Sequence, residues 1–178
     1  MIQILIHLAL LPIFFIVKII PTKKNLYVFG SGKGYAFSDN SKYLFLELRK
    51  QPQIQCVWLT KSKFLDAELR DRNVKSYYIY SIKGLFTLIR SEKCFISYRL
   101  DDLNPIFLGN KKIVQLWHGI PIRGIGFDDD FKFNSLYSAL KSMILSFLQK
   151  IVPFYHYMYC DFLLISSKNI IKRYSSAF

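Results

Sequence analysis

The sequence predicts an α/β fold with a mainly parallel sheet, preceded by an apolar N-terminal helix. After Pro21, short apolar runs alternate with stretches in which apolar residues recur at helical spacing, the pattern of consecutive βαβ units. The chain has 178 residues, of which 52% are apolar and 17% aromatic. This length and composition allow one domain with a substantial core and exclude a disordered chain.

Residues 1–22 form the first predicted unit, an apolar helix that anchors the chain to a membrane. As a helix, Met1 to Ile20 extends about 30 Å, the thickness of a hydrocarbon core. Pro12 interrupts the run, so the helix either spans the membrane or lies in its inner leaflet, and a buried first helix of the globular domain is the third interpretation. By the positive-inside rule, residues 23–178 lie on the cytoplasmic face. The charges that predict this orientation are Lys18, Lys23 and Lys24.

Strands and helices alternate through residues 23–178. The predicted strands are Leu26 to Gly30, Ile54 to Leu59, Val74 to Tyr80, Lys93 to Tyr98, Lys112 to Trp117 and Asp161 to Ile165. The predicted helices open at Ser38 or Asp39, run from Lys63 to Arg72, start at Ser81, run from Asn134 to about Val152, and follow Ser166 and Ser167. In the helix that starts at Ser81, the spacing predicts that one face is core: Ile82, Leu85, Phe86 and Ile89.

A glycine-rich loop, Gly30 to Gly34, joins the first strand to the helix after it. It does not match the P-loop pattern, because Lys33 is followed by Gly34 instead of Ser or Thr, and it does not match Gly-x-Gly-x-x-Gly, because Tyr35 occupies the wrong position. The backbone N–H groups of such a loop can still bind an anion, and Lys33 adds positive charge. A plain flexible turn explains the glycines equally well.

The fourth strand ends in Arg99-Leu100-Asp101-Asp102, at the edge where the fifth strand also ends if the sheet is parallel. Arg99 is a candidate phosphate ligand. Asp101 or Asp102 is placed to orient a histidine, although solvated loop charges are the simpler account of both. The adjacent aspartates from Asp128 to Asp130 cannot all face one ion, so no metal site is predicted.

The most informative stretch is Gln115 to Asp130, where an apolar strand gives way to glycines, a proline and an arginine. His118 directly follows the fifth strand, at the edge where open α/β sheets bind ligands. An unperturbed histidine pKa of about 6.5 leaves much of the ring neutral near pH 7, as a general base requires. Gly119 permits close backbone approach, Pro121 stiffens the turn, and Arg123 can bind phosphate. The alternative is a histidine that fills a polar corner.

Charge and cysteine content limit the partners and the compartment. The net charge of +13 favours an anionic partner, which is nucleic acid, an acidic lipid headgroup or a phosphorylated substrate. No nucleic-acid-binding motif is visible and the basic residues do not share one periodic face, so no nucleic-acid partner is expected. The three cysteines lack a Cys-x-x-Cys arrangement, which predicts neither a disulfide framework nor a zinc site and fits a reducing cytoplasm.

The string Leu-Trp-His-Gly-Ile-Pro-Ile-Arg-Gly-Ile-Gly-Phe-Asp around His118 resembles the signature of the CDP-glycerol glycerophosphotransferase family, the teichoic acid primases and polymerases, where Trp-His-Gly-Thr-Pro-Leu-Lys recurs. Here Ile120 replaces the threonine and Arg123 the lysine. The glycine loop also resembles the family's first-strand motif, and the residues that match it are Gly34, Asp39 and Asn40. With Asp-Phe-Leu-Leu-Ile-Ser-Ser near the C-terminus, the resemblance covers roughly Leu26 to Phe178.

The resemblance implies a two-lobed GT-B glycosyltransferase fold with Rossmann-like halves, of which this chain carries the N-terminal lobe and therefore has little activity alone. It implies transfer of glycerol phosphate from CDP-glycerol, the donor substrate, to a lipid-linked acceptor in teichoic acid biosynthesis, with no other cofactor. His118 is the expected general base. Expected partners are anionic membrane lipid, a lipid-linked glycan acceptor and a separate chain that carries the second lobe, at the cytoplasmic face of the cell membrane. The expected substrate-binding residues are Gly34, Asp39, Asn40, Gly119, Pro121, Arg123, Lys33 and Arg99. The alternative is a non-catalytic, membrane-associated module that binds anionic glycolipid.

Overall fold

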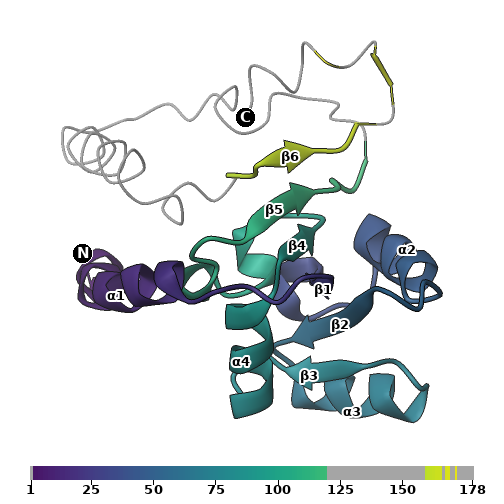
Figure 1. The fold of residues 1–178 in the computed structure, drawn as a ribbon, viewed down its shortest axis with the longest axis horizontal. Helices are drawn as coiled ribbons and strands as arrows, with labels where there is room; N and C mark the ends of the chain where they lie inside the picture. The colour runs from purple at the N-terminus through teal and green to yellow at the C-terminus, as the bar shows by residue number, and fades with distance from the viewer. Residues whose placement is uncertain (1, 120–158, 166, 169–170, 172–178) are drawn as a thin grey trace.

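The computed structural model of the chain describes residues 2–119, 159–165, 167–168 and 171. Its strands form one parallel sheet in the order β3-β2-β1-β4-β5-β6 (Figure 1). The predicted α/β class is confirmed, and this order is that of a Rossmann-like sheet, in which the winding reverses between β1 and β4. The strands are β1 (Leu26–Phe29), β2 (Gln55–Thr60), β3 (Ser76–Tyr78), β4 (Lys93–Ile96), β5 (Lys112–Gln115) and β6 (Phe162–Leu163).

Four α-helices and three short 3-10 turns accompany the strands within the described residues, with the first helix before the first strand and the others between strands. The predicted helix from Asn134 to Val152 lies outside those residues, as does most of the helix predicted after Ser167. The helices are α1 (Ile2–Ile19), α2 (Asp39–Leu48), α3 (Lys63–Asp71) and α4 (Ile82–Arg90), and the 3-10 turns are η1 (Gly32–Gly34), η2 (Leu100–Asp102) and η3 (Pro105–Phe107).

The two faces of the sheet carry different cores. Helices α2 and α3 cover one face and α4 the other (Figure 1). Because successive residues of a strand point to opposite faces, Phe29 of β1 joins an aromatic cluster while Val28 joins an aliphatic one. The Phe29 ring stacks on Phe95 at 4.7 Å between centroids and meets Phe45 edge-on at 5.3 Å. These contacts fix the central strands and thereby the edge where their carboxyl ends emerge.

The predicted core face of α4 is partly wrong. Ile82 and Phe86 are 89% and 63% exposed, whereas Gly84 and Leu88 are buried. The reason is steric: a Cβ on Gly84 would overlap the carbonyl oxygen of Tyr78, so the glycine of the helix packs directly on the end of β3 and on Ile79 after it. The close approach rotates the larger apolar side chains outward.

Helix α1 extends away from the sheet and packs near its C-terminal end on the segment around η3 (Figure 1). Phe14 and Val17 are buried there, while Ile16 and Ile19 are 57% and 81% exposed. Among the described residues, no helix has both the length and the apolar character that a membrane crossing requires. The boundary after residue 22 and the anchoring role of α1 stay predictions.

Candidate active site at the carboxyl edge of the sheet

The loops that follow β1, β4 and β5 meet at one edge of the sheet. The glycine loop follows β1, the segment from Ser97 to Asp102 follows β4, and Leu116 to Gly119 follows β5. The N-terminus of α2 lies against the same edge, because the backbone N–H of Ser41 donates to Ser97 Oγ at 3.0 Å and the two hydroxyls are 2.7 Å apart. The structure therefore brings most of the predicted site segments together.

His118 presents an exposed ring held by a defined hydrogen bond. Its Nδ1 lies 2.9 Å from the carbonyl oxygen of Ser97. A carbonyl oxygen only accepts, so Nδ1 carries the proton, and in the neutral ring Nε2 is then the atom with a free lone pair. The ring also stacks on Trp117 at 4.6 Å and packs near Tyr98 at 5.2 Å. This tautomer is the one that can take a proton through Nε2.

The turn that carries His118 is strained and is held by two amide side chains. Trp117 has φ +57°, a left-handed conformation that costs a bulky residue on the order of 1–2 kcal/mol. Asn40 Nδ2 donates to the carbonyl oxygens of Leu116 and Trp117 at 3.1 and 2.9 Å. Gln115 Oε1 accepts the Trp117 N–H at 3.1 Å. Asn40 therefore fixes the backbone beside the histidine, while its predicted role in binding substrate stays a prediction.

Asp102 ties the glycine loop to the end of β4. This fully buried carboxylate accepts the backbone N–H of Lys33 at 2.7 Å on Oδ1, and those of Ser97 and Tyr98 at 3.0 and 2.7 Å on Oδ2. Burial raises the pKa of Asp102, and the three N–H bonds oppose that rise. From the sequence, Asp102 is expected either to orient a histidine or to be a solvated loop charge. Both expectations are wrong, because the carboxylate accepts backbone N–H groups and is buried. The ring of His118 is oriented by a carbonyl oxygen instead.

Three predicted residues surround Tyr98, whose own role was not predicted. Lys33 Nζ lies 5.7 Å from the centre of the Tyr98 ring and Arg99 Cζ lies 5.2 Å from it, on the ring that also neighbours His118. Arg99 also pairs with Asp101, at 2.9 Å between Nη2 and Oδ2. Lys33 is exposed and adds positive charge. The side chains of Lys33, Arg99 and His118 therefore all lie near the ring of Tyr98.

The glycine loop adopts left-handed backbone angles at three consecutive residues, Gly32, Lys33 and Gly34, with φ of +57°, +59° and +88°. The buried Gly34 is held by its carbonyl oxygen, which accepts the Thr60 hydroxyl at 2.8 Å and the Lys61 N–H at 2.7 Å. The loop is therefore a fixed structure, in contrast to the plain flexible turn considered above.

Two further side chains, Asp39 and Lys61, form hydrogen bonds next to this loop. Asp39, at the start of α2, accepts the hydroxyls of Ser31 and Ser38 at 2.6 and 2.9 Å, which clamps the loop onto the helix. Lys61, which the sequence did not single out, donates from Nζ to the Asp101 carbonyl oxygen at 2.5 Å. Burial lowers the pKa of Lys61, and the nearby carboxylates of Asp101 and Asp102 partly restore it.

A groove of about 520 Å³ opens beside His118. Its walls combine polar and apolar groups from α2, from the turn after β5 and from the chain after β6, including Asn40, Trp117 and Leu164. Gly119 is exposed in this groove, and a Cβ on it would touch nothing within 4 Å. Pro121 and Arg123 lie outside the described residues. Across the part of the chain that the structure describes, no group of His, Cys, Asp and Glu side chains is arranged to hold a metal ion.

Comparisons with known proteins agree on one family. The family model described as "CDP-Glycerol:Poly(glycerophosphate) glycerophosphotransferase" matches residues 13–178. The chain is 29% identical over 106 residues to a teichoic acid glycerol-phosphate transferase of Staphylococcus aureus (strain NCTC 8325 / PS 47), which covers 59% of this chain and 26% of that protein. The chain thus spans about a quarter of the length of the curated relative that it matches.

Solved structures of the wall teichoic acid polymerase TagF share the fold. One of them matches 99% of this chain and 42% of its own with a TM-score of 0.62 at 17% identity. A variant of the same polymerase soaked with CDPG matches 88% of this chain and 37% of its own with a TM-score of 0.60 at 19% identity. At these identities the similarity establishes the architecture of the chain.

Proposed function

Because the chain belongs to the CDP-glycerol:poly(glycerophosphate) glycerophosphotransferase family, we propose that it takes part in the transfer of glycerol phosphate from CDP-glycerol to a lipid-linked acceptor in teichoic acid biosynthesis. In this reaction an acceptor hydroxyl oxygen forms a bond to the phosphorus that bears the glycerol. The bond from that phosphorus to the oxygen of CMP breaks, and CMP leaves with the electron pair.

The observation that carries the proposal is the geometry of His118. Its Nδ1–H is engaged by the Ser97 carbonyl oxygen at 2.9 Å, which leaves Nε2 of an exposed ring as the basic atom at the mouth of the sheet. Nε2 takes the proton of the acceptor hydroxyl as its oxygen attacks. A general base of this kind contributes about 10²–10⁴-fold to the rate.

Positive charge and backbone geometry supply the rest of the proposed site. Lys33 and Arg99 flank the Tyr98 ring next to His118 and offset the charge of phosphate oxygens. The exposed Gly119 lets phosphate approach the backbone, the buried Gly34 fixes the shape of the loop, and Asp39 and Asn40 hold the surrounding segments in place. Pro121 and Arg123 keep the roles that the family motif assigns to them, as predictions. CDP-glycerol enters as substrate, and no further cofactor is proposed.

We further propose that the reaction takes place at the cytoplasmic face of the cell membrane. The support is the apolar exposed side of α1, where Phe15, Ile16 and Ile19 are 48%, 57% and 81% exposed, together with the net charge of +13. The acceptor is then a glycan or polymer borne by a membrane lipid. Because the family fold is two-lobed, we propose that a second lobe, on this or another chain, binds the donor.

The test is CMP release in a mixture of CDP-glycerol and lipid-linked acceptor. It is run with the chain alone and with the chain fused in place of the equivalent region of the staphylococcal relative, so that a second lobe is present. H118A is expected to lower release by about 10²–10⁴-fold. F64A is the matched control, because Phe64 is an 80% exposed ring on α3, away from the site. Undiminished transfer by H118A would exclude His118 as the base.

The alternative is a non-catalytic membrane module that binds anionic glycolipid. The exposed side of α1 and the positive charge suit both functions, whereas the oriented imidazole suits only the transferase. The same assay separates them, because a binding module retains glycolipid in both wild type and H118A and releases no CMP in either the isolated or the fused form.

A further inference from the structure

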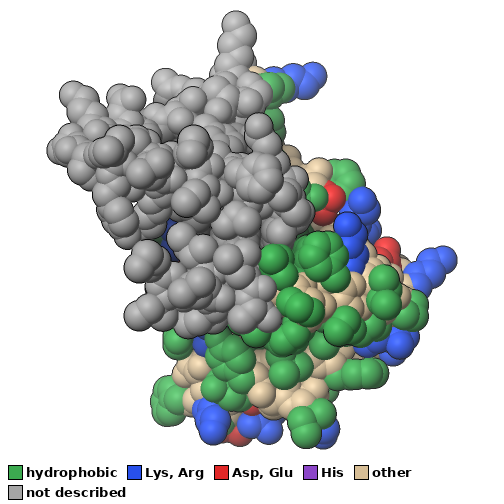
Figure 2. All heavy atoms as spheres, turned by 90° about the vertical axis from the view of Figure 1, so that its left-hand side faces the viewer, with side chains coloured by type: hydrophobic (Ala, Val, Ile, Leu, Met, Phe, Trp, Pro, Cys, Tyr) green, Lys and Arg blue, Asp and Glu red, His purple; other side chains and the backbone are tan. Residues whose placement is uncertain are grey.

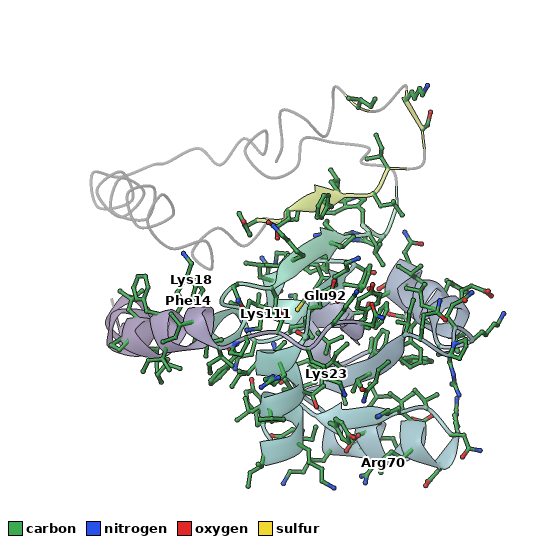
Figure 3. The ribbon with its side chains drawn as sticks, viewed as in Figure 1. Phe14, Lys18, Lys23, Arg70, Glu92 and Lys111 are labelled. Atoms are coloured by element: carbon green, nitrogen blue, oxygen red, sulfur yellow. The ribbon has the colours of Figure 1, made fainter. Side chains whose placement is uncertain are left out.

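A second pocket, of about 210 Å³, lies where α1 meets the start of β5. Lys111 directly precedes β5 and His118 follows it, so the pocket is on the order of 20 Å from the histidine along the strand. Figure 3 shows Phe14 and Lys18 at the end of α1 nearest the sheet, beside Lys111. The pocket is therefore separate from the candidate active site.

Lys111 is the unusual residue of this pocket. Lys111 is only 3% exposed, yet no carboxylate among the described residues forms an ion pair with it. Its Nζ donates to Asn110 Oδ1 at 3.3 Å, which uses one of three N–H donors. Burial lowers the pKa of Lys111 to about 8. A buried ammonium without a counter-charge is costly, and an anion in the pocket would relieve that cost.

The surrounding charges favour an anion. Lys18 and Lys112 also line the pocket, against one carboxylate, Asp161. That carboxylate already accepts the Ile113 N–H at 2.8 Å on Oδ2 and lies 3.7 Å from Lys112 Nζ through Oδ1. The volume equals that of several water molecules, so a phosphate group with its ester oxygen fits.

The helix beside the pocket favours a membrane lipid as the source of the anion. Phe14 lines the pocket and is buried, whereas Ile13, Phe15, Ile16 and Ile19 on the same helix are exposed. Figure 2 looks onto the side from which α1 projects and shows hydrophobic side chains gathered there, with Lys and Arg side chains nearby. Apolar side chains next to cations are suited to a bilayer interface with anionic headgroups. Binding of a soluble phosphate would not explain the exposed apolar side chains of α1.

We propose that the pocket formed by Lys18, Lys111 and Lys112 binds the phosphate headgroup of an anionic membrane lipid while the exposed side of α1 lies in the bilayer interface. This deepens the membrane location within the proposed function, but it depends on a different set of residues. H118A, which is expected to lower the proposed transfer by about 10²–10⁴-fold, is expected to leave this binding intact.

The experiment is co-sedimentation of the full chain with phosphatidylcholine vesicles, with and without phosphatidylglycerol, at fixed ionic strength. Wild type is expected to bind the anionic vesicles, and K111M to bind them about tenfold more weakly. K18Q and K112Q change exposed lysines, so they give a readout that does not depend on folding of a core variant. K50M is the matched control, because Lys50 is an exposed lysine two residues after the end of α2, paired with Glu47. Equal losses in K50M and K111M would mean only general charge attraction and would overturn the site.

A second arm separates a lipid headgroup from a free phosphate. Inorganic phosphate is titrated into the wild-type chain by calorimetry without vesicles, and I16S and I19S are tested with vesicles. The lipid site predicts weak phosphate binding and a clear loss of vesicle binding in both serine variants. Tight phosphate binding that K111M removes, with vesicle binding unchanged in I16S and I19S, would identify a soluble-anion site and refute the lipid proposal. H118A is expected to sediment like wild type, so failure of either proposal is recognised separately.

Discussion

Replacing Lys111 by methionine is expected to stabilise the folded chain at neutral pH. Methionine keeps the length of the side chain and removes a buried charge that pairs with no carboxylate among the described residues. Burial lowers the pKa of this lysine from 10.5 to about 8. At 1.36 kcal/mol for each pH unit between these values, the protonated form is disfavoured in the folded state by at most about 3 kcal/mol.

The sign of the pH dependence follows from the same two pKa values. Below pH 8 both states hold the proton and the wild type bears the full penalty. Between pH 8 and 10.5 the folded state releases the proton while the unfolded state keeps it, so the wild type gains stability as pH rises. The free-energy advantage of K111M over wild type is therefore largest near pH 7 and vanishes above about pH 10.5.

The assay is urea unfolding at several pH values in phosphate-free buffer, followed by the fluorescence of the buried Trp58 and Trp117. Taking the difference between wild type and K111M cancels the other titrating groups, and K50M should follow the wild type at every pH. A K111M advantage that stays constant from pH 7 to 10 would refute the argument. So would a K111M that is less stable than wild type at pH 7.

Three further predictions concern the carboxyl edge of the sheet. N40A should lower CMP release up to about 10²-fold with little change in KM, because the turn before His118 loses two hydrogen bonds; an unchanged rate would remove its positioning role. G30A should cost about 1–3 kcal/mol, because its Cβ would lie 2.5 Å from the Asp102 carbonyl oxygen, whereas G119A, with open space, should unfold like wild type. D102N should cost about 1–3 kcal/mol in urea unfolding, since an amide nitrogen would face a buried N–H donor.

The strands were predictable because each is a short apolar run between turn residues, a signal that depends only on local sequence. The run from Lys112 and the run from Leu26 both begin where the observed strand begins. The face of α4 was not predictable from spacing alone, since Gly84 decides it through contact with a distant carbonyl oxygen. Periodicity gives the presence of a helix, while its rotation depends on the surface that it meets.

The candidate site divides in the same way. His118, Lys33 and Arg99 were singled out because their residue types suit the chemistry and they follow strands; their catalytic and binding roles stay predictions. Tyr98 and Gln115 were missed, because an aromatic ring and a buried amide gain their roles only when β4 and β5 are side by side. A search for polar or aromatic residues among the last three residues of each predicted strand would have selected both.

The carboxylate of Asp102 has a mechanical consequence. It bonds the N–H of Lys33 with one oxygen and that of Ser97 with the other, and Ser97 in turn holds the imidazole through its carbonyl. The glycine loop and the His118 ring are thus held relative to each other by this short chain of hydrogen bonds before any substrate binds. In the proposed reaction, the loop that binds phosphate and the ring of His118 are already held by this one carboxylate, so little ordering entropy remains to be lost when the proton is transferred.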